Sequence, residues 1–64
     1  MFYRLTDNVL INLSRIEAVQ RTGTDTETGN YRVVILMRSG EYLTYWLDIQ
    51  EWDGLVRQLG EMIG

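Results

Sequence analysis

The stretch that decides the fold is residues 31–47, which read YRVVILMRSGEYLTYWL. Two runs of β-branched, aromatic and long aliphatic residues lie on either side of Ser39 and Gly40. This combination is typical of a β-hairpin with a two-residue turn. A half-buried strand alternates apolar and polar residues, whereas these two runs scarcely alternate. We therefore expect both faces of the hairpin to need apolar cover.

The rest of the chain predicts a single α+β domain over residues 1–64. Short apolar runs at 2–5 and 9–12 flank a turn cluster at 6–8, and residues 13–15 suit a tight corner or one 3₁₀ turn. A loosely alternating run follows at 16–22, and the polar stretch 23–30 predicts an exposed hairpin loop. The expected sheet is antiparallel, with three main strands and one or two short N-terminal strands.

An amphipathic helix is predicted after Asp48. That residue is a good N-cap, and Glu51 three positions later completes a capping box. Gly54 and Gly60 each weaken a helix by about 1 kcal/mol relative to alanine. The helix therefore depends on packing against one face of the sheet. Its apolar stripe has steps of three and four residues at Ile49, Trp52, Val56, Leu59 and Ile63, and Leu55 and Met62 widen it.

Counting outward from a two-residue turn predicts the register of the hairpin and therefore its two faces. Arg38 then lies opposite Glu41, and Ile35 lies opposite Thr44. The face that we expect to receive the helix carries Val34, Leu36, Leu43, Tyr45 and Leu47. The second face carries Tyr31, Val33, Ile35, Met37, Tyr42, Thr44 and Trp46.

The second face is rich in the aromatic residues and methionine that are enriched at the buried centres of protein interfaces. We expect a partner or dimer interface there, formed by Tyr31, Val33, Met37, Tyr42, Thr44 and Trp46. Small domains often need oligomerisation when they lack disulfides or a metal, and this chain has neither cysteine nor histidine. The alternative is intramolecular core, with the N-terminal runs folded over this face through Phe2, Tyr3, Leu5, Val9 and Ile11.

The residue types present do not indicate catalysis. Without cysteine or histidine, the chain has no ready nucleophile or base, and Ser14 and Ser39 lie in turns where a hydroxyl is usually structural. The oxygen-bearing stretch 25–30 lacks the spacing of an EF-hand loop. We therefore expect a protein that is not an enzyme, with no catalytic residue, cofactor or metal.

Charge and hydropathy narrow the partners further. Nine acidic and six basic residues give a net charge of −3, which argues against a general nucleic-acid binder. No apolar run approaches the ~20 residues of a membrane span, and no signal-peptide pattern is present, so we expect a cytoplasmic protein. The base of the long loop could still contact a partner through Arg21, Asp25, Glu27 and Arg32.

Residues 11–19, INLSRIEAV, are followed by a strand, a Ser-Gly turn, a second strand and a closing helix. This order resembles the FlbD-type small proteins of flagellar gene clusters, and its hydrophobic rhythm is similar to that of the LytTR-type DNA-binding domain. In size, charge and architecture the chain also resembles phage or mobile-element proteins that inhibit bacterial defence, such as anti-CRISPR proteins.

Together these features predict a non-enzymatic, homodimeric protein-binding module. We interpret it as an inhibitor or regulator of a host protein complex, carried by a phage or mobile element. Two alternatives stay open: a small nucleic-acid-binding regulator and a structural accessory subunit.

Overall fold

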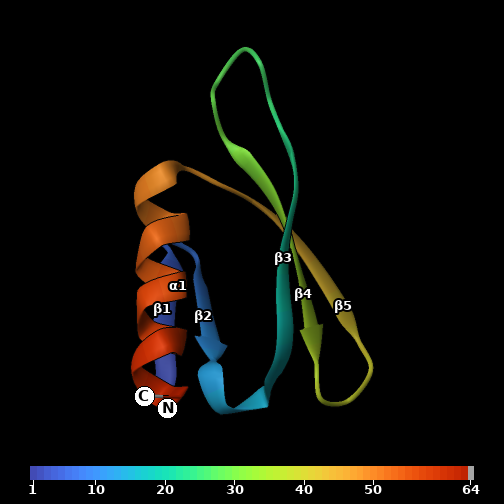
Figure 1. The fold of residues 1–64 in the computed structure, drawn as a ribbon, viewed down its shortest axis with the longest axis vertical. Coiled ribbons are helices and arrows are strands. Elements are labelled where there is room, and N and C mark those ends of the chain that lie inside the picture. The colour runs from blue at the N-terminus through green and yellow to red at the C-terminus, as the bar shows by residue number, and fades with distance from the viewer. Residues whose placement is uncertain (64) are drawn as a thin grey trace.

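A computed structural model describes residues 1–63, with side chains through Met62, so the predicted contribution of the Ile63 side chain lies outside the described part. The chain forms an antiparallel β1–β2 hairpin and a three-stranded antiparallel sheet in the order β3-β4-β5, followed by a helix (Figure 1). The predicted α+β architecture is confirmed. Its elements are β1 (Phe2–Thr6), β2 (Val9–Asn12), the 3₁₀ turn η1 (Leu13–Arg15), β3 (Ile16–Thr24), β4 (Tyr31–Met37), β5 (Tyr42–Leu47) and α1 (Ile49–Ile63).

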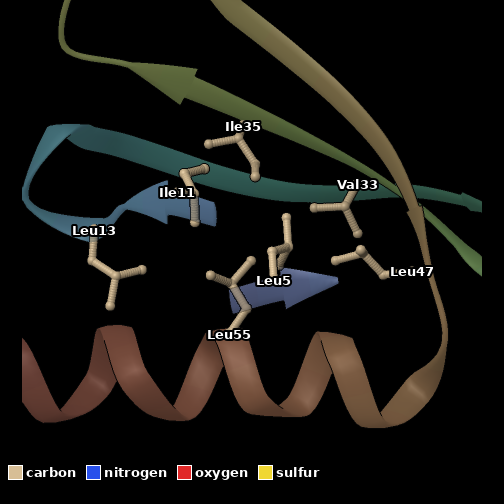
Figure 2. Packing of buried hydrophobic residues seen from close by; sticks show 7 residues of the cluster. All are labelled: Leu5, Ile11, Leu13, Val33, Ile35, Leu47 and Leu55. Carbon is tan, nitrogen blue, oxygen red and sulfur yellow. The ribbon is translucent and has the colours of Figure 1, made fainter. Parts of the chain in front are cut away.

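The hydrophobic core lies on one face of the three-stranded sheet. Figure 2 shows the β1–β2 hairpin between this sheet and α1, with side chains from all three layers converging. The helix and the N-terminal hairpin therefore cover the same face of the sheet rather than one face each. The buried hydrophobic residues of this core are Leu5, Ile11, Leu13, Val33, Ile35, Leu47 and Leu55.

The helix begins as its sequence predicts. The Asp48 backbone N–H donates to Oε1 of Glu51 at 2.9 Å, and the Glu51 backbone N–H donates to Oδ1 of Asp48 at 2.7 Å, which completes the capping box. Leu55 is fully buried at the centre of the stripe, while Trp52 and Leu59 are half-buried beside it. The corner at η1 is also confirmed, and Oδ1 of Asn12 accepts a 3.2 Å hydrogen bond from the Ser14 backbone N–H.

The prediction of a two-residue turn between β4 and β5 is wrong, because the turn has three residues. The Gly40 N–H donates to the Met37 carbonyl at 2.9 Å, and the Met37 N–H donates to the Glu41 carbonyl at 2.9 Å. Gly40 has a φ of +90°, which glycine adopts without steric cost. The connection thus comprises residues 38–40 and has the form of a turn followed by a glycine bulge. Arg38 lies within the turn rather than opposite Glu41.

This slip of one residue turns β5 over relative to β4. Ile35 now lies opposite Leu43, and Val34 lies opposite Thr44. The prediction that α1 packs on the face with Val34 and Leu36 is therefore wrong. The observed register places the most apolar alternate positions of both strands together, and the helix and hairpin cover them. That core face carries Tyr31, Val33, Ile35 and Met37 with Leu43, Tyr45 and Leu47.

The loop between β3 and β4 is shorter than predicted, because β3 continues to Thr24. Its backbone is closed by hydrogen bonds from the Asp25 N–H to the Asn30 carbonyl (2.8 Å) and from the Gly29 N–H to the Asp25 carbonyl (2.7 Å). It is a self-contained turn at the far end of the sheet (Figure 1). Within residues 1–63, α1 falls short of the length and apolar content that crossing a membrane requires.

Candidate functional site: the open face of the sheet

The side of the three-stranded sheet opposite the core is built from cross-strand rows. Ala18, Leu36 and Tyr42 form one row, because Leu36 pairs with both of the others. The next row consists of Gln20, Val34 and Thr44, and a third places Arg32 opposite Trp46. We call this surface the open face, and it comprises Ala18, Gln20, Arg32, Val34, Leu36, Tyr42, Thr44 and Trp46.

The open face exposes its two aromatic rings to solvent. Tyr42 is 66% exposed and Trp46 is 53% exposed, whereas Val34 and Leu36 between them are half-buried. A shallow hollow of about 120 Å³ lies among Val34, Leu36 and Tyr42, with β3 residues at its border. Contiguous exposed apolar surface of this kind marks interaction sites on small proteins.

One cation belongs to the open face, and it is held in place. Nε of Arg32 donates to Oγ1 of Thr22 at 2.8 Å, and that hydroxyl donates to the Arg32 carbonyl at 3.3 Å. The guanidinium is thereby tied to β3 in the row that ends at Trp46. The eight residues of the face include no carboxylate, so it offers apolar and aromatic contacts, the neutral polar groups of Gln20 and Thr44, and one positive charge.

The structure divides the predicted interface between two faces. Tyr42, Thr44 and Trp46 lie on the open face, whereas Tyr31, Val33 and Met37 lie on the core face. Val33 is completely buried, so it offers no surface to a partner. The prediction that these six residues share one surface is therefore wrong, and the cause is the turn.

Sequence reasoning missed the contribution of Val34, Leu36 and Arg32 to the open face. The signal was available in Arg38-Ser39-Gly40, since a three-residue connection with glycine last is the next most common hairpin after the two-residue type. Choosing that connection would have given the observed register and placed these residues beside Tyr42 and Trp46.

The two arginines predicted at the loop base lie on opposite faces of the sheet. Arg32 is on the open face, while Arg21 lies opposite Val33 on the core side. Cζ of Arg21 is 4.5 Å from the centroid of the Tyr31 ring and 5.7 Å from that of Trp52. The Tyr31 and Trp52 rings meet edge to face, with centroids 6.5 Å apart. Arg21 thus closes the rim of the core through cation–π contacts.

Of the two acidic residues that were predicted to contact a partner, Asp25 has a structural role within the loop. Oδ1 of Asp25 accepts a 2.9 Å hydrogen bond from the Glu27 backbone N–H, which stabilises the turn. Glu27 itself is exposed beside it. Over the described residues 1–63, acidic side chains do not gather into a group of three that could hold a metal ion.

A second hollow lies between α1 and β3 and has a volume of about 550 Å³. We call it the α1–β3 groove. Its β3 wall comprises the four consecutive residues 16–19, and its helix wall includes Trp52, Val56 and Met62. Val56 and Met62 are 45% and 43% exposed, so the helix presents apolar surface to this groove.

No family model, curated protein or solved structure matches this chain.

Proposed function

We propose that this protein is a non-enzymatic binding module whose open face contacts another protein. The observation that carries the proposal is the exposure of Tyr42 and Trp46 above the half-buried Val34 and Leu36. Tyrosine and tryptophan are the residue types most often found as binding hot spots. Both residues lie on β5, in a sheet whose opposite face is packed against the core.

The two exposed rings supply apolar area that a partner can cover. A tryptophan buries roughly 150–250 Å² when fully covered, and about half of Trp46 is still exposed. Covering the remaining ~100 Å² at ~25 cal/mol per Å² contributes roughly 2.5 kcal/mol, or nearly two factors of ten in affinity. Tyr42 adds a comparable contribution from the neighbouring row.

In the proposed role, the protein acts in the cytoplasm and regulates a host protein complex by covering one of its surfaces with the apolar residues of the open face. Its small size, acidic charge and architecture support an inhibitor or regulator of the kind carried by phages and mobile elements. We also propose that the protein is a homodimer, as the sequence predicts. A structural accessory subunit would use the same face to join a larger assembly.

The test is a charge placed on the open face. We expect Trp46→Glu to leave the fold intact, since Trp46 lies outside the core, and to abolish the capture of host proteins that the wild-type chain retains. Leu10→Glu is the matched control, because Leu10 is 61% exposed on β2 and distant from the open face. Circular dichroism verifies folding, and mass spectrometry compares the captured proteins. Retention of the same proteins by the folded Trp46→Glu variant would refute the proposal.

One observation favours binding of single-stranded nucleic acid as the second candidate function. Arg32 lies directly opposite Trp46 on the open face, and an arginine beside an exposed ring suits the stacking of unpaired bases. Binding of this kind weakens steeply with salt because it depends on phosphate contacts. Titration of a fluorescent oligonucleotide at about 50 and about 200 mM salt tests for nucleic-acid binding. The affinity of an aromatic contact with a protein should change little between these two salt concentrations.

A further inference from the structure

The outer edge of β3 opens onto the α1–β3 groove. β3 is an edge strand of its sheet, and β2 lies between it and α1 in Figure 1. The groove touches residues 16–19 in sequence, although alternate side chains of a strand point to opposite faces. A hollow that touches four consecutive residues therefore reaches the backbone edge itself. Within residues 1–63, β4 is the one strand that pairs with β3.

We propose that this edge pairs antiparallel with β3 of a second copy, around a two-fold axis through Val19. The pairing joins two three-stranded sheets into one sheet of six strands. A two-fold contact is the commonest symmetry of soluble oligomers, and it uses the same surface on both copies. The inference rests on the homodimer of the proposed function and assigns its contact surface, leaving the open face to a different protein.

Charge complementarity selects this register. With Val19 on the axis, Glu17 of each copy, at the bulge just before the regular stretch, comes close to Arg21 of the other, so two pairs of opposite charges face each other. Within β3, an axis through Ala18 would place Glu17 opposite Val19, and an axis through Gln20 would place Glu17 opposite Gly23, so neither forms a charge pair. Among these neighbouring registers, the Val19 axis alone matches opposite charges.

The shape of β3 also favours a closed pair over an open-ended array. Its register with β4 shifts between Ile16 and Ala18 and again between Arg21 and Gly23. Bulges of this kind twist an edge and limit how far another strand can pair with it. The regular stretch, residues 18–21, is centred close to Val19. Val56 and Met62 on the groove wall give apolar cover to the incoming strand.

Dimerisation through β3 would also enlarge the open face. Strands about 4.8 Å apart that rise about 3.3 Å per residue give three strands of five residues a flat footprint of roughly 250 Å². Pairing at β3 places two open faces side by side and doubles this footprint to roughly 500 Å². The dimer would therefore offer another protein twice the platform of a single copy.

Single cysteines test the axis cleanly, because the chain has no cysteine of its own. Val19→Cys places two thiols opposite each other across the axis, within reach of a disulfide after mild oxidation. Thr44→Cys is the control, since Thr44 lies on the open face on β5, at the sheet edge opposite β3. We expect a covalent dimer from Val19→Cys and a monomer from Thr44→Cys. The reverse pattern would overturn the inference and indicate that open faces meet.

Charge reversal tests the same contact without new covalent chemistry. Glu17→Arg places like charges opposite each other, and we expect it to weaken self-association roughly tenfold or more by sedimentation. Glu27→Arg makes the same charge change in the loop and should leave association unchanged. The inference would be overturned if the two variants associated equally strongly. A wild-type chain that stays monomeric at roughly 100 μM would overturn it as well. Host-protein capture that depends on Trp46 would survive that failure, so the two proposals are separable.

Discussion

Gly54 and Gly60 occupy the same helix, yet alanine should have opposite effects at the two positions. A Cβ built at Gly54 would lie 2.5 Å from Oη of Tyr3, whereas a Cβ at Gly60 has no atom within 4 Å. Alanine is favoured over glycine in a helix interior by about 1 kcal/mol. Gly60→Ala should therefore raise the free energy of unfolding by nearly that amount, which corresponds to roughly 4–8 °C in the melting temperature of a domain this small.

At Gly54 the same gain is opposed by overpacking. A Cβ–Oη distance of 2.5 Å is far shorter than van der Waals contact, so the Tyr3 ring or the helix must move. Overpacking of a filled site costs about 1–3 kcal/mol. After the helix gain of about 1 kcal/mol is subtracted, Gly54→Ala should leave the protein between unchanged and about 2 kcal/mol less stable. The glycine thus permits the close approach of β1 to α1.

Removing the hydroxyl group of Tyr3 should turn Gly54→Ala from a neutral or destabilising change into a stabilising one. With Tyr3→Phe, the nearest remaining ring atom is Cζ at 3.8 Å, an ordinary contact distance. The double variant Tyr3→Phe/Gly54→Ala should then approach the stability of Gly60→Ala, giving a coupling energy of about 1–3 kcal/mol in a double-mutant cycle. Thermal and urea unfolding of the four proteins measure this coupling. A Gly54→Ala variant stabilised as much as Gly60→Ala would show that β1 does not pack against the helix here.

Three further predictions concern the helix and the loop. Trp52→Ala should lower the free energy of unfolding, measured with urea, by about 3 kcal/mol. This is the low end for a large aromatic residue, because Trp52 is half-buried against Tyr31 and Arg21. A loss below about 1 kcal/mol would contradict that packing. Asp48→Ala should lower the free energy of unfolding by about 1 kcal/mol through the lost cap, and an unchanged melting temperature would mean that the capping box contributes nothing. Replacing residues 25–30 with a short Asn-Gly turn should keep stability within about 1 kcal/mol, because the loop is closed by its own hydrogen bonds and loop-closure entropy changes slowly with length; failure to fold would show that the loop does more than connect β3 to β4.

Local chemistry made much of the fold predictable. The capping box and the apolar stripe around Leu55 depend on spacings within a few residues, and the sequence states both directly. The strands and the 3₁₀ corner at η1 were predictable for the same reason. These features depend on hydrogen bonds and spacings between residues that are near neighbours in the sequence. They can therefore be predicted without knowing how the rest of the chain folds.

The tertiary structure decided how the sheet is covered, and it acted together with the local turn at residues 38–40 in fixing the register. Both faces of the β4–β5 hairpin are apolar, so the hydrophobic pattern could not distinguish two registers that differ by one residue. The turn at Gly40 and the joint packing of α1 and the β1–β2 hairpin selected one of them. That selection placed Val33 in the core and Val34 on the open face. The physical reason is that burial is a property of long-range packing, whereas the sequence alone specifies which residues are apolar.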